Sequence, residues 1–216
     1  MKNRLFFVQC TNRECLLRFP LDLSQFKGSY CPRCGAPLDQ DCAALVQSKL
    51  PADLLAARHR LVGVLDNIRS IHNVGSIFRT ADGAGLEELH LCGITPTPED
   101  HPNLAKTALG SQLGTPWQYH PNTPALVKQL QTEGTLILAL EVTATSQVLF
   151  ESSFPATPGL SVALVVGNEP AGIDPQVLKL ADATLSLPML GDKGSLNVSV
   201  AFGIAAYWLQ FARNSP

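Results

Sequence analysis

After about residue 60, the hydrophobic and polar positions of the chain follow two alternating patterns. Short apolar runs, typical of buried strands, alternate with segments whose apolar residues recur every three or four positions, as in helices. The pattern predicts strands at 61–65, 89–93, 135–140, 161–166 and 183–187, and helices at 74–85, 123–133, 175–181 and 195–211. This rhythm is typical of an α/β domain with a mostly parallel sheet.

The last predicted helix carries more apolar residues than one buried face needs. Ser195 is its candidate N-cap. Apolar residues at helical spacing follow, and others widen the stripe: Leu196, Val198, Val200, Ala201, Ile204, Ala205, Tyr207, Trp208 and Phe211. We expect this helix to pack against both the sheet and a second subunit; a central helix in a monomer is the alternative.

Before residue 60 the pattern is different. Four cysteines form two short turns that could bind one tetrahedral Zn²⁺ with their thiolates: Cys10, Cys15, Cys31 and Cys34. The spacing predicts a zinc ribbon at 1–40, with Cys42 as a substitute ligand or a metal-free lobe as alternatives. Residues 41–60 have a helical composition and are predicted to connect the ribbon to a main domain at 61–216. Cys92, in an apolar strand, is expected in the core.

Composition and charge narrow the class of protein. The chain has 216 residues, of which 45% are hydrophobic and 16% charged, as in a packed globular protein and unlike a disordered or coiled-coil chain. It contains no run of about 20 apolar residues and no signal peptide at its start. We therefore expect a cytoplasmic protein with reduced thiols and no membrane contact.

The net charge of −2 does not indicate a nucleic-acid-binding protein, but it hides an asymmetry. Residues 1–60 contain nine Lys or Arg against five Asp or Glu, whereas the remainder contains seven against thirteen. An anionic partner could bind the basic front of the chain. Ordinary solvated surface charge is the alternative.

Three polar segments that contain glycine begin at the ends of predicted strands, where open α/β sheets bind ligands. They span 66–82, 165–175 and 185–200. Asn73 is a candidate helix N-cap, and Arg79 follows inside a helix where a buried guanidinium would need an anion or acceptors. Glycines such as Gly172 let the backbone approach a ligand. The chain lacks G-x-G-x-x-G, the P-loop, G-x-S-x-G and H-E-x-x-H motifs, which weighs against NAD enzymes, NTPases and hydrolases.

These segments carry a family resemblance. The runs DNIRSIHNVGSIFRTADGAG, VALVVGNEPAGIDP and LSLPMLGDKGSLNVSVAFGIAAY resemble, in order, the three motifs of the SpoU (TrmH) branch of the SPOUT RNA methyltransferases. The resemblance covers about 150 residues, from 61 to 213. HLCGITPTPEDHPNLAKTALGSQ is also similar to a linker of this branch, whereas the predicted zinc ribbon is a departure from its common members.

The resemblance implies a fold and a reaction. The fold would be a SPOUT-type Rossmann-like domain whose C-terminal part forms a deep trefoil knot, assembled as a homodimer. The enzyme would transfer a methyl group from S-adenosylmethionine to a ribose 2′-hydroxyl of tRNA or rRNA, with no DNA substrate expected. Cofactor contacts would fall at Leu140, Gly167, Gly172, Leu187 and Leu196. The family's functional positions match Asn73, Arg79, Glu169, Ser195 and Asn197.

The family's proposed base corresponds to Arg79, yet arginine is effectively always protonated. We favour a role in which Arg79 binds the phosphate beside the target ribose and lowers the pKa of the hydroxyl. Transient acceptance of the proton is the alternative. Asn73 and Asn197 would orient the ribose or Arg79, and Glu169 would fix loop geometry. Zinc would be structural, because methyl transfer needs no metal.

Two further questions stay open at the level of sequence. The ribbon could bind RNA through its basic residues or only stabilise the protein; these residues are Lys2, Arg4, Arg13, Arg18, Lys27 and Arg33. The whole chain could also be a catalytically silent RNA-binding protein that kept the knotted fold, or a Rossmann-like enzyme that uses a nucleotide cofactor and acts on no RNA.

Overall fold

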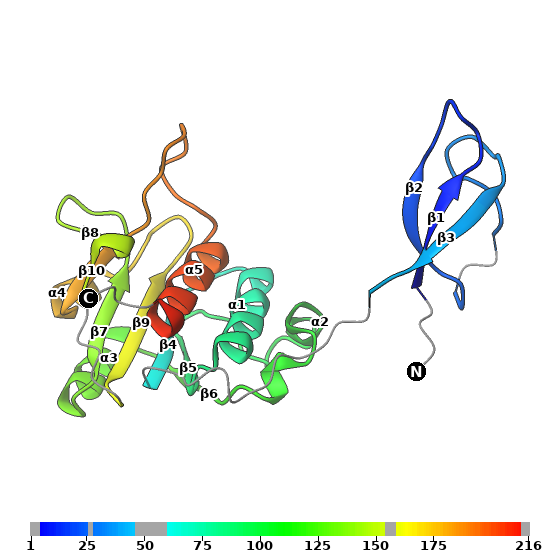
Figure 1. Cartoon of the computed structure of the whole chain (residues 1–216). Coiled ribbons are helices and arrows are strands. Elements are labelled where there is room, and N and C mark those ends of the chain that lie inside the picture. The colour runs from blue at the N-terminus through cyan, green and yellow to red at the C-terminus, as the bar shows by residue number, and fades with distance from the viewer. Residues whose placement is uncertain (1–4, 26–27, 46–59, 154–158, 213–216) are drawn as a thin grey trace. The chain divides into compact units, whose positions relative to one another are not determined.

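The computed structural model describes residues 5–25, 28–45, 60–153 and 159–212. The chain divides into two compact units, residues 1–55 and 56–216 (Figure 1). Each unit has its own sheet. Within the described residues, no helix has the length and apolarity that a membrane crossing requires.

The N-terminal unit contains an antiparallel sheet in the order β2-β1-β3. Its strands are β1 (Leu5–Cys10), β2 (Arg18–Asp22) and β3 (Leu38–Ala43). The predicted helical connector is therefore wrong at residues 41–43, where Cys42 and Ala43 pair with Phe7 and Phe6 of β1. Tertiary pairing overrides the helical composition of this short segment. Residues 46–59 of the connector lie outside the described residues.

The larger unit is built on a seven-stranded sheet in the order β6-β5-β4-β9-β7-β10-β8, with every neighbouring pair parallel. Five strands confirm the prediction: β4 (Arg60–Asp66), β5 (Glu88–Cys92), β7 (Leu136–Leu140), β9 (Ser161–Gly167) and β10 (Ala183–Ser186). β6 (Trp117–His120) and β8 (Gln147–Val148) were not predicted and form the two edges. The predicted α/β class with a parallel sheet is confirmed.

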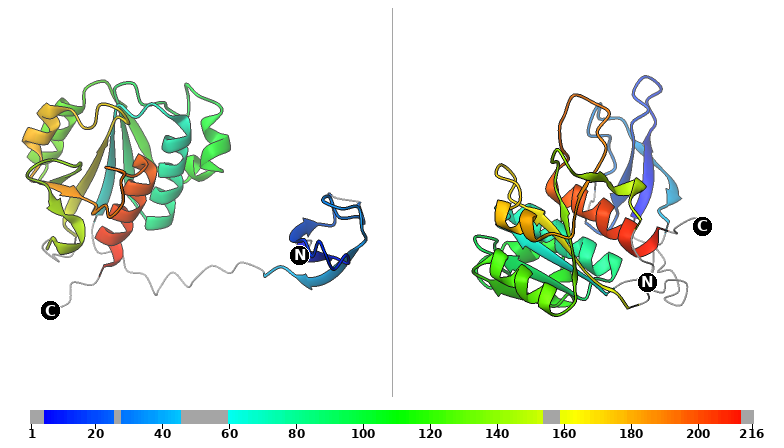
Figure 2. Two further views of the ribbon diagram at one scale, coloured as in Figure 1. Left: turned by 90° about the horizontal axis from the view of Figure 1, so that it is seen from above. Right: turned by 90° about the vertical axis from the view of Figure 1, so that its left-hand side faces the viewer.

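Helices cover both faces of this sheet (Figure 2). On one face α1 (Ile71–Ala84) and α5 (Val198–Phe211) bury Phe78 and Phe202. On the other face α3 (Thr123–Thr132) and α4 (Pro175–Leu180) bury Val127 and Val177. The fully buried Cys92 confirms its predicted place in the core. Short helices α2 (Leu104–Ala108), η2 (Ser111–Leu113) and η3 (Leu149–Glu151) complete the unit.

Two predicted helix caps are wrong. α1 begins earlier than expected, with Ser70 as its N-cap, and the side chain of Asn73 is engaged elsewhere. α5 begins later, with Asn197 as its N-cap, because the Asn197 side chain accepts the backbone N–H of Ser199 at 2.9 Å. Asn73 and Asn197 therefore both lie within one turn of a helix start.

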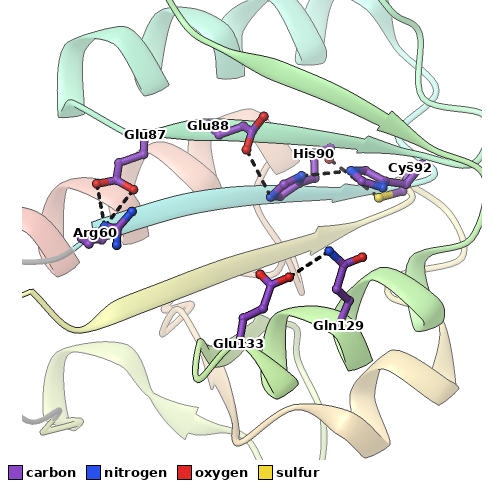
Figure 3. A network of polar contacts seen from close by, with 8 residues as sticks. Arg60, Glu87, Glu88, His90, Cys92, Gln129 and Glu133 are labelled. Carbon is purple, nitrogen blue, oxygen red and sulfur yellow. Dashed lines mark hydrogen bonds and ion pairs between the residues drawn. The ribbon is translucent and has the colours of Figure 1, made fainter.

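A polar network lies across the ends of β4, β5 and α3 (Figure 3). His90, on β5, is only 5% exposed, and its Nδ1 lies 3.1 Å from Nε2 of His120. Burial, helped by the neighbouring His120, lowers the pKa of His90 to about 4. Glu88 and Glu133 line the same small cavity of about 230 Å³. At neutral pH His90 is therefore an uncharged side chain among carboxylates.

Candidate active site

The parallel strands end at one edge of the sheet, and a cavity of about 610 Å³ lies there. Its walls are the segments that follow β7, β9 and β10, together with the start of α5. All five residues predicted to contact a cofactor line it: Leu140, Gly167, Gly172, Leu187 and Leu196. The volume lies in the range of small-molecule sites.

A chain of hydrogen bonds joins the three polar segments beside this cavity. The Asn73 amide nitrogen donates to Glu169 Oε1 at 2.8 Å. The Asn197 amide nitrogen in turn donates to Asn73 Oδ1 at 3.0 Å. Asn197 Oδ1 then accepts from Ser199 at the start of α5. Residues more than 90 positions apart in the chain thus form one connected polar unit.

Glu169 fixes the loop that precedes α1. Its carboxylate also accepts the backbone N–H groups of Arg69, at 2.9 Å, and Ser70, at 3.1 Å. Burial alone would raise the pKa of Glu169, but the hydrogen bonds from Arg69, Asn73 and Ser70 outweigh it and lower that pKa below its ordinary value. The side chain is therefore a carboxylate, suited to holding geometry and not to delivering a proton.

The two glycines predicted to contact the cofactor, Gly167 and Gly172, allow the turn after β9 to form. A Cβ at Gly167 would lie 2.3 Å from the backbone nitrogen of Ile173, so the turn after β9 could not fold back as it does. Asn168 and Gly172 close that turn with two backbone hydrogen bonds, and Gly172 has a φ of +73°. The sequence predicted that these glycines let the backbone approach a ligand. The structure shows that the missing side chain of Gly167 leaves room for the backbone of Ile173.

Ser195 and Leu196 stand in the loop before α5. Both are exposed and line the cavity. Within the described part of the chain, Ser195 has no hydrogen-bond partner. It is therefore free to meet a ligand, although it does not cap the helix.

Arg79 lies apart from the other predicted catalytic residues. It follows Asn73 by six positions on α1, about 9 Å along the helix axis at 1.5 Å per residue. Its side chain is exposed, does not line the 610 Å³ cavity and finds no ion-pair partner among the described residues. It lines instead a second hollow of about 390 Å³ with Asp82 and the 108–114 segment. The guanidinium is thus open to an external anion.

Asp66, the last residue of β4, and Asn67 after it were not predicted as site residues. Asp66 is buried and accepts the Thr123 hydroxyl at 2.5 Å and the backbone N–H of Asp174 at 2.8 Å. Asn67 has a φ of 60°. Its backbone carbonyl oxygen accepts a hydrogen bond from the side-chain Nδ2 of Asn168 at 2.6 Å. A carboxylate that ends an otherwise apolar strand was the available signal.

Glu141, which directly follows β7, was also missed. It lines the cavity, and its carboxylate accepts the backbone N–H groups of Val142 and Ile173, both at 3.0 Å. The cavity wall therefore contains two carboxylates, Glu141 and Glu169. None of the described lining residues is Lys, Arg or His.

In the N-terminal unit the four predicted zinc ligands converge. The sulfur atoms of Cys10, Cys15, Cys31 and Cys34 all lie within 4.8 Å of one another. Cys42 is exposed and stands outside this group. Four thiols gathered in this way are the donor set of a structural zinc site.

Comparison of sequences supports the family resemblance. The model of the SpoU rRNA methylase family matches residues 60–207. A 23S rRNA (guanosine(2553)-2′-O)-methyltransferase of Bacillus subtilis (strain 168) is 32% identical over 179 residues, which cover 78% of this chain and 68% of that protein. A tRNA (guanosine(18)-2′-O)-methyltransferase of Escherichia coli (strain K12) is 30% identical over 164 residues, which cover 76% of this chain and 69% of that protein.

Solved structures are similar as well. An S-adenosylmethionine-bound rRNA methyltransferase from Sinorhizobium meliloti superposes with a TM-score of 0.62 at 28% identity, covering 68% of this chain and 54% of that one. A TrmH/SpoU tRNA-modifying enzyme from A. aeolicus gives a TM-score of 0.62 at 28% identity, covering 71% and 76%. The prediction of an RNA (ribose-2′-O-)-methyltransferase is thereby confirmed at the level of the family: the chain belongs to the SpoU rRNA methylase family.

Proposed function

We propose that this protein transfers the methyl group of S-adenosylmethionine to a ribose 2′-hydroxyl of a tRNA or rRNA. The observation that carries the proposal is the hydrogen-bonded chain from Glu169 through Asn73 to Asn197, beside a cavity at the C-terminal edge of the sheet. The matched relatives named above methylate guanosine 2′-oxygens, one in rRNA and one in tRNA. Both RNA classes therefore stay open for this chain.

The chemistry of the cavity wall fits this cofactor. A pyrophosphate would find no cationic side chain among the described lining residues, whereas a sulfonium or ammonium group would meet two carboxylates. The buried Thr143 hydroxyl, also in the wall, has no hydrogen-bond partner within the described residues. The two carboxylates, with no cationic side chain among the described lining residues, favour S-adenosylmethionine over NAD. When bound, it supplies a methyl group activated by positive charge.

The protein's own part in the reaction is alignment and charge. Asn73 and Asn197 are fixed to one another at 3.0 Å and can hold a ribose hydroxyl in place. Arg79, exposed and unpaired within the described residues, would bind the phosphate beside that ribose and favour the ionised hydroxyl. The proton then leaves to water or to a phosphate oxygen. We propose these catalytic and positioning roles for Arg79, Asn73, Glu169, Ser195 and Asn197.

We infer that two copies of the chain assemble through α5. Three apolar side chains on or next to this helix are exposed in one copy: Leu196 by 40%, Val200 by 50% and Tyr207 by 47%. A soluble helix rarely leaves such a stripe uncovered. The homodimer, the trefoil knot and a cytoplasmic location all stay predictions, and gel filtration with light scattering tests the first.

The cysteine cluster is proposed to hold a structural zinc ion. Its four thiols match the donor set, and the folded sheet brings them together. Of the basic residues expected to bind RNA, Arg13 and Arg33 are exposed, while Arg18 is paired with Asp41 and stacks on Phe7. Lys2, Arg4 and Lys27 lie outside the described residues. Arg13 and Arg33 are therefore the pair whose removal best tests RNA binding by this unit.

The main experiment measures tritium transfer from labelled S-adenosylmethionine to bulk tRNA and to bulk rRNA. We expect one class to be labelled, and Arg79→Ala to lower the rate by about 100-fold or more, because a transition-state charge loses its partner. Mapping 2′-O-methylated nucleotides in cells with and without the gene then identifies the site. A wild-type protein that binds RNA but never transfers label would favour the catalytically silent alternative.

A further inference from the structure

Glu141 lines the 610 Å³ cavity but is not among the residues to which the family resemblance assigns a function. It follows the last residue of β7, and its backbone N–H donates to Leu185 of the neighbouring β10 segment at 2.9 Å. The side chain is partly buried and lines the cavity. A carboxylate in such a place costs free energy unless something compensates its charge.

The protein holds this carboxylate in one position. Oε2 accepts the backbone N–H of Ile173 and Oε1 that of Val142, both at 3.0 Å. Gly172 leaves the room that Oε2 occupies, since a Cβ there would lie 2.6 Å from it. Two backbone N–H donors, together with the space left by Gly172, thus hold the Glu141 carboxylate in the cavity wall.

The charge is left unbalanced by the described part of the protein. No Lys, Arg or His among the described residues pairs with Glu141, and none lines the cavity. Glu169 differs, because three donors from the α1 segment occupy its carboxylate. A carboxylate offers about four acceptor positions, and Glu141 uses two of them within the protein. It therefore remains available to a ligand.

We propose that Glu141 is a specificity-determining residue that makes the cavity select a positive charge at the reacting sulfur. This inference rests on the proposed function. Methyl transfer breaks the bond between sulfur and the methyl carbon, forms the bond between that carbon and the ribose oxygen, and releases the hydroxyl proton. The sulfonium thereby becomes a neutral thioether. The same carboxylate that attracts the donor then attracts the product S-adenosylhomocysteine less, which favours exchange of product for donor.

Glu141→Gln tests the charge at nearly constant size. Isothermal titration calorimetry would measure three ligands: S-adenosylmethionine, S-adenosylhomocysteine and sinefungin, which carries an ammonium group where the methylated sulfur stands. We expect S-adenosylmethionine and sinefungin to weaken about tenfold, and S-adenosylhomocysteine less than about threefold, because only the first two hold a cation at that position. Glu99→Gln, at an exposed carboxylate outside the cavity, is the matched control.

The readout is the ratio between charged and uncharged ligands, which a partly unfolded sample does not change. Glu141→Asp keeps the charge and should keep a ratio near that of the wild type even if all affinities fall. Equal weakening of all three ligands in Glu141→Gln would overturn the inference, because Glu141 would then bind their shared adenosine or amino-acid part. Unchanged affinities would overturn it too. If the wild type bound none of the three, the proposed function itself would fail.

Discussion

Two cavities lined by described residues of the larger unit differ in how their charged groups are used. In the 610 Å³ cavity, backbone donors from other segments hold Glu141 and Glu169, and the asparagines join these segments. In the 230 Å³ cavity, buried His90 contacts His120, while Arg60 and Glu87 pair with one another at its exposed rim. The first arrangement joins residues more than 90 positions apart, whereas His90 contacts His120, 30 positions away, and Glu88, two positions away.

Polar residues that line a cavity can serve either a ligand or the stability of the fold, and their contacts distinguish the two cases. Fixed carboxylates at the C-terminal edge of a parallel sheet form a preorganised site, because their positions do not depend on a ligand. Burial instead keeps His90 neutral, so this side chain affects how the free energy of unfolding depends on pH. We therefore expect substitutions in the first cavity to change methyl transfer and those in the second to change the pH dependence of unfolding.

The largest effect is expected from Glu169→Ala. Three donors lose their acceptor, so the loop before α1 and the position of Asn73 are no longer fixed. Methyl transfer should fall by about 100-fold or more, and the free energy of unfolding by about 1–3 kcal/mol. Tritium transfer and urea unfolding measure both, with Glu99→Ala as the exposed control. Transfer within threefold of the wild type would show that the hydrogen-bonded chain is not needed.

The next effect concerns pH and the second cavity. The pKa of His90 is about 4 in the folded protein, against about 6.5 in the unfolded chain, so only the unfolded chain gains a proton between these values. The free energy of unfolding should therefore be highest above pH 6.5 and fall by up to about 3 kcal/mol as the pH approaches 4. His120, whose pKa is also lowered, and the carboxylates Glu88 and Glu133 face the same cavity.

His90→Phe removes this titrating group and should flatten the fall in stability between pH 6.5 and 5. The slope, and not the absolute stability, is the measured quantity, because the substitution also changes packing. His101→Phe, at an exposed position, is the control and should keep the wild-type slope. Equal slopes for the wild type and His90→Phe would show that other groups cause the pH dependence.

Apolar periodicity was sufficient to predict most of the larger unit. The strands β4, β7 and β9 were predicted correctly because each is a short run of mostly buried apolar residues. The edge strand β6 was missed because it has only four residues, in which aromatic and polar side chains alternate, and because its conformation depends on pairing with β5. β3 was misassigned for a related reason, since pairing with β1 decides its conformation.

The sequence predicted several residues that lie at the candidate site, but not the hydrogen bonds that join them. Glu169, Ser195 and Asn197 were singled out from their segments, and they do line one cavity. The bond between Asn73 and Asn197 joins positions 124 apart, which no local pattern encodes. Both helix caps were misassigned because a tertiary partner took the side chain of Asn73 and because the loop before α5 extends two residues further. Glu141 was missed because it looks like an ordinary loop carboxylate.

A smaller effect is expected from Asn197, whose side chain has two functions that substitutions can separate. Its Oδ1 caps α5, and its amide nitrogen donates to Asn73. Asn197→Ala should lower the free energy of unfolding by about 0.5–2 kcal/mol through the lost cap. Asn197→Asp keeps the acceptor and loses the donor, so it should recover the stability while methyl transfer stays low. Recovery of both would assign Asn197 to helix capping alone.

The smallest effect is expected at the rim of the second cavity. Arg60 Nε lies 3.0 Å from Glu87 Oε1, but the two side chains are 63% and 45% exposed. Water and salt screen such a pair, so Glu87→Gln should change the free energy of unfolding by no more than about 0.5 kcal/mol.

Arg60 and Glu87 also line the cavity that His90 lines, so the same variant tests whether the pH dependence of stability comes from this exposed pair. The fall in stability between pH 6.5 and 5 should match the wild type, because burial of His90 is the main cause of its lowered pKa. A shallower fall in Glu87→Gln would assign part of the response to the exposed carboxylate and weaken the contrast between the buried His90 and the hydrogen-bonded chain beside the larger cavity.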